Sequence, residues 1–139
     1  MNLPQIEARR WFQQSRADMQ IVRTLIAAGH YAAACFYSQQ AGEKALKSVI
    51  YSQGARVVLG HSIRQLAEQC GAYDPVFTEL MGEAATLDQF YIPTRYPNGL
   101  PPPAIPSETY SGSDAEVAQK GSDHILQVVE VFLHKQFDP

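Results

Sequence analysis

The sequence contains little cysteine and no long hydrophobic run. Its two cysteines, Cys35 and Cys70, lie far apart and outside any CxxC pair, which argues against a disulfide scaffold or a zinc module. The longest stretch without charged residues, Thr24 to Gly42, contains histidine, serine and glutamine and is too polar to span a bilayer. The N-terminus lacks the layout of a signal peptide. We expect a cytoplasmic protein with reduced thiols and no membrane partner.

Motifs for cofactor- and metal-dependent chemistry are also absent. The chain has no glycine-rich phosphate loop, no HExxH pair, no nucleophile elbow and no Glu-x-x-His pair of a di-iron bundle. We therefore expect no cofactor and no metal. The composition, 45% hydrophobic and 18% charged over 139 residues, is typical of one globular domain, which we place at 1–139.

Charge is distributed unevenly, although the net charge is only −3. Up to Arg64 there are eight basic and three acidic residues, and from Gln65 onward there are three basic and eleven acidic ones. A uniformly basic nucleic-acid-binding protein would not contain such an acidic half. Two interpretations remain open: two solvated faces of opposite sign, or halves that attract each other within the fold or a dimer.

Proline is concentrated in one region. Six of the nine prolines lie between Pro93 and Pro106, and three of them are consecutive. Proline lacks a backbone donor and fixes its own φ angle, so this region cannot form a regular helix or a central strand. The sequence predicts a long loop from Ile92 to Gly112.

Elsewhere the apolar residues recur at helical spacing, and no alternating strand pattern persists. We expect an all-α, antiparallel up-and-down bundle of four long helices plus one short helix, with the Pro-rich loop before the last helix. Glycines and capping residues set the limits. The expected limits are a first helix ending at Gly29, a second from Tyr31 to Gln53, a short helix capped by Ser62, a fourth from Asp74-Pro75 onward, and a last one opened by a capping box from Ser113 to Glu116.

The second predicted helix has polar residues on its apolar face. Phe36 and Leu46 are expected to point inward, and the stripe between them passes through Gln39 and Glu43, with Lys47 on the adjoining row. Burying such groups without partners costs about 2 kcal/mol or more for each. The stripe is therefore either a satisfied polar network or dimer seam, or a pocket lined by Gln39, Glu43 and Lys47.

A second polar cluster lies at the fourth predicted helix, whose apolar stripe extends to Tyr91, and at the exit of that helix. It comprises Asp88, Tyr91, Thr94, Arg95 and Tyr96. A guanidinium between two tyrosines could bind a phosphate while a ring stacks on a base. The alternative is that Arg95 pairs with Asp88 or with carbonyls at the helix end. The candidate ligand-binding residues are Gln39, Glu43, Lys47, Asp88, Tyr91, Arg95 and Tyr96.

Several stretches resemble one family. The segment from Ala34 to Lys47 resembles the second-helix signature of the HEPN domain family (higher eukaryotes and prokaryotes nucleotide-binding domain). The likeness continues through Gly54, His61-Ser62-Ile63, Tyr91 to Pro97, Tyr110 and Asp114-Ala115. It implies a helical bundle that dimerises through its long helices. It also implies a small nucleotidyltransferase-like partner, in a toxin–antitoxin or defence context.

The resemblance leaves catalysis open. Many HEPN proteins are ribonucleases whose site is an arginine, four to six residues, and a histidine; the histidine would transfer protons and the arginine would stabilise the phosphorane. Arg23 with His30 and Arg56 with His61 match that spacing, but chance alone yields about 0.6 such matches in this chain. We expect His61 instead to satisfy a free backbone group beside the cap residue Ser62.

These observations favour a non-catalytic nucleotide- or partner-binding module. We expect a homodimer formed through the first two helices. The first alternative is a metal-independent endoribonuclease toxin of the HEPN type, with Arg56 and His61 as the candidate catalytic residues. The second is a purely structural dimerisation domain.

Overall fold

The chain folds into helices joined by tight turns and two longer connections. The computed structural model describes residues 1–138 and contains no strand within them. The all-α class predicted from the sequence is confirmed. The helices are α1 (Leu3–Ala27), α2 (Tyr31–Ser52), α3 (Ile63–Gly71), the 3-10 helix η1 (Pro75–Leu80), α4 (Met81–Asp88), the 3-10 helix η2 (Pro97–Gly99), α5 (Pro106–Thr109) and α6 (Gly112–Phe137).

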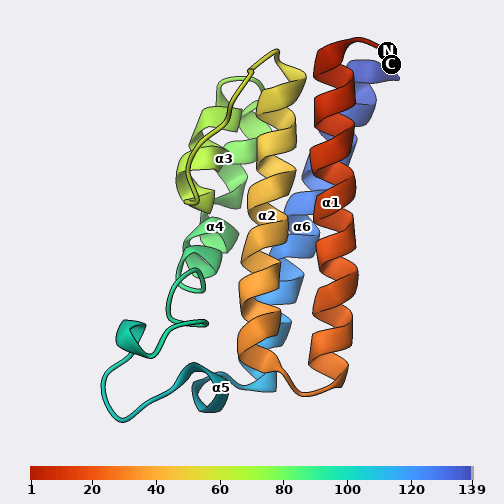
Figure 1. Cartoon of the computed structure of the whole chain (residues 1–139). Coiled ribbons are helices and arrows are strands. Elements are labelled where there is room, and N and C mark those ends of the chain that lie inside the picture. Colours follow the sequence, from red (N-terminus) through yellow and green to blue (C-terminus); the bar gives the residue numbers. More distant parts are fainter. Residues whose placement is uncertain (139) are drawn as a thin grey trace.

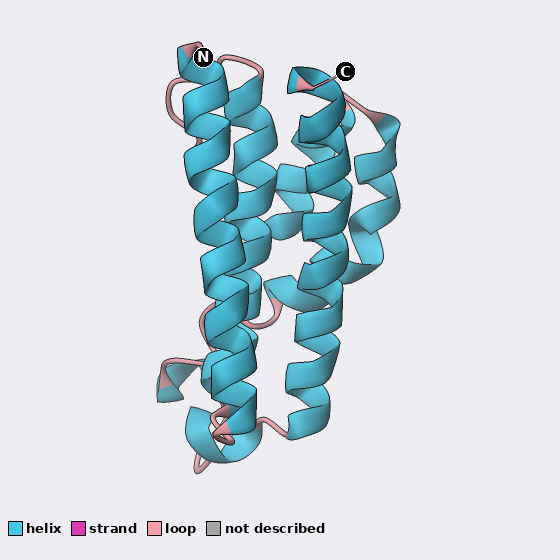
Figure 2. Ribbon diagram, turned by 90° about the vertical axis from the view of Figure 1, so that its right-hand side faces the viewer, coloured by secondary structure: helices cyan, strands magenta, loops and turns pink. Residues whose placement is uncertain are grey.

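Three long helices form the body of the molecule. α1, α2 and α6 lie side by side, and the two chain ends meet at the same end of the bundle (Figure 1). Figure 2 shows the long helices running along one another from a second direction. α3 packs on α2, and α4 packs on both α3 and α6. α2 is the central helix, because sixteen of its twenty-two residues are buried.

The limits of the first two helices follow local signals. The Asn2 side chain accepts a hydrogen bond from the Gln5 N–H at 3.0 Å, and the Gln5 side chain accepts one from the Asn2 N–H at 3.2 Å. Gly29 and Gly54 follow α1 and α2 with φ angles of +80° and +97°, a conformation that costs glycine little. The predicted ends of both helices are confirmed.

The fourth helical segment is shorter than the sequence predicts. Asp74 caps it as expected and accepts a hydrogen bond from the Val76 N–H at 3.0 Å. However, Pro75–Leu80 is a 3-10 helix, a common form at helix starts, and α4 has only eight residues. The bundle therefore has three long helices rather than four, and Tyr91 lies beyond α4.

Ser111, and not Ser113, caps the last helix. The Ser111 hydroxyl accepts a hydrogen bond from the Asp114 N–H at 3.2 Å, and the Asp114 carboxylate accepts one from the Ser111 N–H at 2.9 Å. Both serines are followed three residues later by an acid, so the pattern alone did not distinguish them. Between Ile92 and Gly112 the predicted loop is present, with the short helices η2 and α5 inside it.

The helix directions depart from a strict up-and-down order. α2, α3 and α6 run in one direction, whereas α1 and α4 run in the other (Figure 1). The cause is the connection 53–62, which returns past α3 before α3 begins. An extended chain covers about 3.3 Å per residue, so this connection is long enough to cross one short helix.

The elements around α2 meet closely at Gly42. A Cβ at this position would lie 3.5 Å from the side chains of Ile63, Leu87 and Ile125, which belong to α3, α4 and α6. This packing brings the start of α3 against the middle of α2, beside the polar stripe. Among residues 1–138, no helix has the length and apolar character needed to cross a membrane.

Candidate functional site

The polar stripe of α2 is buried, and its groups have partners. Gln39 is fully buried, its amide Nε2 donates to the His61 carbonyl at 2.8 Å, and its Oε1 accepts from Gln40 Nε2 at 2.7 Å. The Glu43 side chain is 5% exposed and that of Lys47 is 7% exposed. Of the two interpretations of the stripe, a satisfied polar network therefore describes its buried part.

Glu43 joins the stripe to the surface of the protein. One carboxylate oxygen, Oε2, lies 3.3 Å from Lys47 Nζ, and the other, Oε1, lies 3.0 Å from His61 Nδ1. The Lys47 ammonium also lies 5.7 Å from the centre of the Trp11 ring. A buried carboxylate needs such partners because desolvation of a lone charge is costly.

His61 is held in one orientation although its side chain is 57% exposed. Its ring stacks on Tyr91, with the centroids 4.8 Å apart and the planes 17° from parallel. Because an ionised carboxylate can only accept hydrogen bonds, Nδ1 is the donor to Glu43. Nε2 then carries the lone pair of the neutral ring, and it makes no hydrogen bond to any residue of the described chain. The expectation that this imidazole satisfies a backbone group is wrong: its partner is Glu43.

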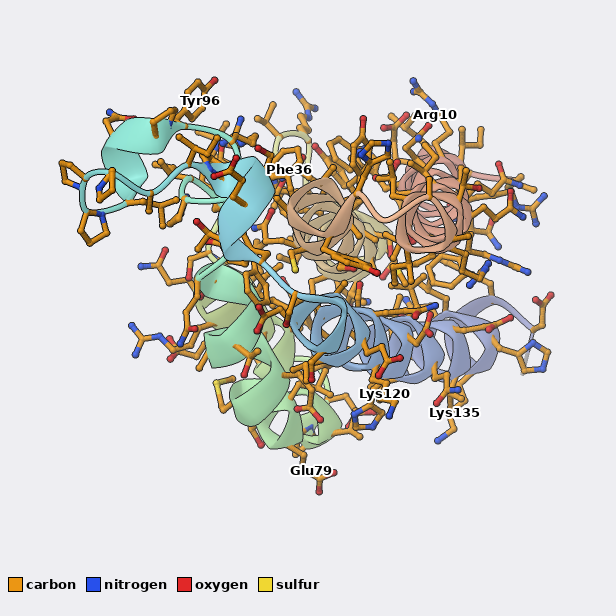
Figure 3. The ribbon with its side chains drawn as sticks, turned by 90° about the horizontal axis from the view of Figure 1, so that it is seen from below. Arg10, Phe36, Glu79, Tyr96, Lys120 and Lys135 are labelled. Atoms are coloured by element: carbon orange, nitrogen blue, oxygen red, sulfur yellow. The ribbon has the colours of Figure 1, made fainter. Side chains whose placement is uncertain are left out.

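Arg95 lies on the same surface and is surrounded by aromatic rings. Its guanidinium carbon is 4.3 Å from the centre of the Phe36 ring, 4.8 Å from Tyr91 and 5.0 Å from Tyr96. Its Nε donates to the Tyr91 carbonyl at 2.9 Å. Figure 3 shows the Phe36 and Tyr96 side chains on the side of the molecule away from Glu79. Cation–π contacts of this kind attract a guanidinium to the rings, and the two Nη atoms of Arg95 make no hydrogen bond within residues 1–138.

Asp88 caps the start of α3, whereas the sequence suggested that it binds a ligand or pairs with Arg95. Its carboxylate accepts hydrogen bonds from the Ile63 N–H at 2.6 Å, the Arg64 N–H at 3.2 Å and the Ser62 hydroxyl at 3.0 Å. It therefore stabilises the start of α3, where a negative charge is favoured. The alternative of an Arg95–Asp88 pair is not what the structure has, and Arg95 bonds instead to a carbonyl just beyond α4.

Tyr91 connects the two clusters that the sequence analysis identified separately. Its ring contacts His61 on one cluster and Arg95 on the other, so Glu43 and Arg95 lie on one side of the bundle. Phe36 completes the surface, although the sequence analysis placed it in the core. Its position one helical turn before the polar residues Gln39 and Gln40 is the sequence signal that would have placed Phe36 beside the polar stripe. We call His61, Tyr91, Arg95, Tyr96 and Phe36 the aromatic surface.

Neither arginine–histidine pair of that spacing is joined by a hydrogen bond among residues 1–138. Arg56 is exposed and forms no hydrogen bond or ion pair with any residue in 1–138. The chain from Arg56 to His61 contains no helix, and it turns at Gly60, whose φ angle is +102°. Arg23 lies near the end of α1 and His30 immediately precedes α2; both are exposed.

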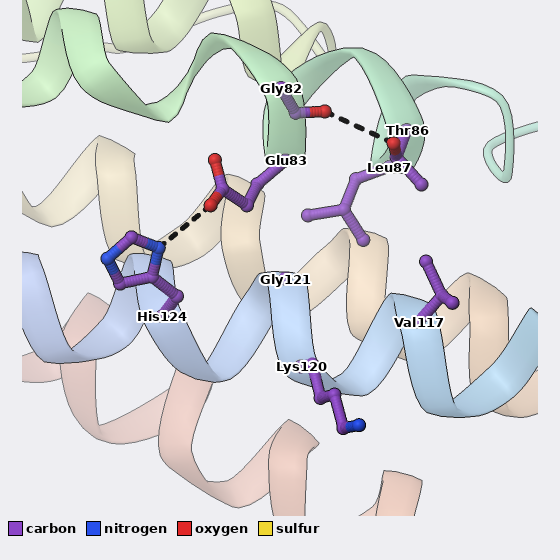
Figure 4. A pocket seen from close by; sticks show the side chains of 8 residues that line it. All are labelled: Gly82, Glu83, Thr86, Leu87, Val117, Lys120, Gly121 and His124. Carbon is purple, nitrogen blue, oxygen red and sulfur yellow. Dashed lines mark hydrogen bonds and ion pairs between the residues drawn. The ribbon is translucent and has the colours of Figure 1, made fainter.

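The remaining reactive groups do not form a metal centre. Burial raises the pKa of both Cys35 and Cys70 to about 12, so the thiols stay protonated at neutral pH. Within the described part of the chain, no three histidine, cysteine, aspartate or glutamate residues are grouped as metal ligands. A second histidine–carboxylate pair, His124 and Glu83, lines a groove of about 520 Å³ between α4 and α6 (Figure 4).

Comparison with known proteins identifies the family. Residues 8–134 match the model of the HEPN domain. The chain belongs to the HEPN domain family, as the resemblance of its motifs predicted.

Relatives with known structures share the whole fold. The protein TT1696 from Thermus thermophilus is 37% identical, with a TM-score of 0.84 over 90% of this chain and 97% of that chain. ST0689, an archaeal HEPN homologue, is 31% identical, with a TM-score of 0.75 over 91% and 98%. A HEPN domain protein from Thermotoga maritima is 27% identical, with a TM-score of 0.72 over 91% and 98%.

A sequence relative carries a functional name. It is the Methanocaldococcus jannaschii protein named "Putative toxin MJ1304", which is 25% identical over 94% of this chain and 90% of its own length.

Proposed function

We propose that this protein is a HEPN-type module that binds a nucleotide or a single-stranded RNA segment on the aromatic surface. The observation that carries the proposal is the placement of the Arg95 guanidinium over three rings, next to the ordered imidazole of His61. A guanidinium edge binds phosphate oxygens, and exposed rings stack on bases. Tyr96, which is 52% exposed, is the ring available for stacking.

The same proposal gives the module a biological setting. Its relative's name supports a role as the toxin component of a toxin–antitoxin pair. We propose that it acts as a homodimer and that a small nucleotidyltransferase-like protein is its partner. Membership of the HEPN domain family supports both assignments.

Binding can be tested directly with a labelled single-stranded oligoribonucleotide and with ATP as two separate probes. Arg95→Ala should weaken binding about tenfold or more, since one stacked or charge-paired contact contributes about 1–3 kcal/mol. The matched control is Arg64→Ala, an exposed arginine on α3, which should bind as the wild type does. Absence of binding by the wild type to both probes, or equal loss in the two variants, would reject the aromatic surface.

A metal-independent endoribonuclease is the second candidate, and one observation favours it. Glu43 orients His61 through Nδ1 at 3.0 Å and leaves Nε2 without a hydrogen-bond partner in residues 1–138, the arrangement in which a carboxylate positions a general base. Nε2 would accept the proton of a ribose 2′-hydroxyl while that oxygen bonds to phosphorus, and Arg95 would stabilise the charge on the phosphorane that forms. The bond from phosphorus to the 5′-oxygen would then break, and the 5′-oxygen would take a proton from water.

RNA cleavage in the presence of EDTA separates the two candidates. An enzyme should produce 2′,3′-cyclic phosphate ends, and His61→Ala should abolish cleavage without loss of helix content. His124→Ala, in the other histidine–carboxylate pair, is the control. RNA binding without cleavage would support the binding module. If neither occurs, the purely structural dimerisation domain is the remaining alternative.

A further inference from the structure

The side of α1 that borders α6 has a regular row of arginine and glutamine side chains. The two residue types alternate at steps of four and three positions, which keeps them on one face of the helix. They are Arg9, Gln13, Arg16, Gln20 and Arg23. We call these residues the arginine stripe. Its arginines recur every seven residues, so each lies two helical turns, or about 10.5 Å, from the next.

The arginine stripe forms one wall of a groove between α1 and α6, which lie side by side on this face of the molecule (Figure 2). The groove consists of two adjoining hollows of about 640 Å³ and 260 Å³, and Arg16 lines both. On the α6 wall, Glu130 lines both hollows and Asp123 lines the smaller one. The floor is made of apolar side chains that are almost fully buried, namely Phe12, Met19 and Leu126.

The arginine stripe is exposed and has no partner within the described chain. None of its side chains makes a hydrogen bond or an ion pair with any residue in 1–138. By contrast, Arg10, which is also on α1 but outside the groove, pairs with Glu7 at 2.6 Å. A row of unpaired cations along a groove raises the local positive potential and attracts a ligand of opposite charge.

Charge and spacing identify the kind of ligand. We propose that this groove docks an amphipathic helix of a partner protein that carries an acidic residue at every seventh position. Such residues also lie about 10.5 Å apart, so each acid meets one arginine along the whole groove. Charged residues beside the contact line of paired helices determine partner choice and orientation, and arginine clusters recognise acidic motifs.

The α6 wall favours a helix over a nucleic acid. Glu130 and Asp123 would repel a phosphate backbone, which is negative on all sides. A helix presents different side chains to its two neighbours, so it can place acids toward α1 and bases toward α6. No residue of the aromatic surface lines the groove. The inference therefore adds a second binding surface and does not depend on the nucleotide or RNA binding proposed above.

A pair of synthetic peptides tests the charge match on the full-length protein. The probe is a fluorescein-labelled helical peptide of three heptads, with one glutamate in each heptad and lysines on the opposite flank. The matched peptide has glutamine in place of the glutamates. Fluorescence anisotropy should show that the wild type binds the glutamate peptide about tenfold more tightly or better. Arg16→Gln/Arg23→Gln should remove this difference with unchanged circular dichroism, and Arg10→Gln/Arg64→Gln should retain it.

Several outcomes would overturn the proposal. They are no binding of the glutamate peptide, equal affinity for the two peptides, and a difference that survives in Arg16→Gln/Arg23→Gln. Weaker oligoribonucleotide binding by that variant, without peptide binding by the wild type, would assign the groove to nucleic acid instead. A loss of dimer in that variant, measured by light scattering, would assign it to a second copy. The test of the aromatic surface with Arg95→Ala stands apart from all of these outcomes.

A disulfide experiment tests the position of the peptide independently of charge. A glutamate peptide with one cysteine beside its central glutamate should crosslink to Gln20→Cys, inside the groove, on mild oxidation. Ile21→Cys is the matched control, because Ile21 is 40% exposed on α1 and does not line the groove. The native cysteines are fully buried and will not compete. Equal crosslinking of the two variants, or none with Gln20→Cys, would overturn docking in this groove.

Discussion

Two histidine–carboxylate pairs in this protein have nearly the same geometry but different surroundings. His61 Nδ1 lies 3.0 Å from Glu43, and His124 Nδ1 lies 2.9 Å from Glu83. The Glu43 side chain is almost fully buried, whereas that of Glu83 is 30% exposed at the edge of the groove between α4 and α6. The contact distance therefore does not distinguish the two pairs.

The surroundings of each pair decide its strength. Water and salt screen the exposed pair, and such pairs contribute little to stability. The buried carboxylate is shielded, so its interactions with Lys47 and His61 are stronger. His61 also stacks on Tyr91, next to Arg95, while His124 has Lys120 and Gly121 as neighbours in its groove. Only the first pair combines an oriented imidazole with groups that suit a phosphate and a base.

The largest difference between the pairs should appear in stability. Glu43→Ala leaves the Lys47 ammonium buried without its partner, and we expect it to lower the free energy of unfolding by about 3–5 kcal/mol. Glu83→Ala should change it by no more than about 0.5 kcal/mol. Urea denaturation followed by circular dichroism measures both. Equal effects of the two substitutions would show that burial does not determine how much each pair contributes to stability.

Asp88 tests whether a carboxylate near the aromatic surface belongs to the site or to the fold. Asp88→Ala removes the acceptor of three hydrogen bonds at the start of α3, and it should lower the free energy of unfolding by about 1–2 kcal/mol. Binding of the oligoribonucleotide should stay within twofold of the wild type, as measured by fluorescence anisotropy. A selective loss of affinity with full stability would return Asp88 to the ligand site.

The sequence predicts the helices and their limits better than it predicts the contacts of the candidate site. Gly29, Gly54 and Asp74 marked helix limits because their signals act within a few residues. The polar stripe through Glu43 was also visible, because helical periodicity alone identifies its face.

The position of His61 was not predictable in the same way. It meets Glu43 only because the connection returns along α3, and that path is set by tertiary packing. Phe36 was assigned to the core for a related reason. Helical spacing identifies the face of the second helix on which Phe36 lies, but it does not say how far along that face the neighbouring helices extend.

Substitution of Tyr91 should have an intermediate effect on stability. It sharpens the comparison of the two histidine–carboxylate pairs, because His61 stacks on Tyr91 whereas His124 has no stacked ring within the described residues. Tyr91→Leu keeps an apolar side chain and removes the ring that contacts His61 and Arg95. We expect a loss of about 1 kcal/mol in stability and weaker oligoribonucleotide binding. The control is Tyr73→Leu, an exposed tyrosine near the end of α3. Unchanged binding in Tyr91→Leu would mean that the two clusters act independently.

The smallest effect is expected at a third carboxylate, Asp123 on α6, which is partly shielded but makes no hydrogen bond or ion pair within residues 1–138. Burial raises its pKa above the ordinary value, and the nearby Arg23 offsets part of that rise. A carboxyl whose pKa is higher in the folded state favours folding when protonated, and this contribution is lost as the pH rises through the folded-state pKa. Asp123→Asn should therefore raise Tm slightly at neutral pH, and the difference should vanish at pH values below the pKa of the unfolded aspartate. Calorimetric scans at neutral and acidic pH measure this difference. A lower Tm for Asp123→Asn at neutral pH would show that attraction to Arg23 outweighs desolvation there.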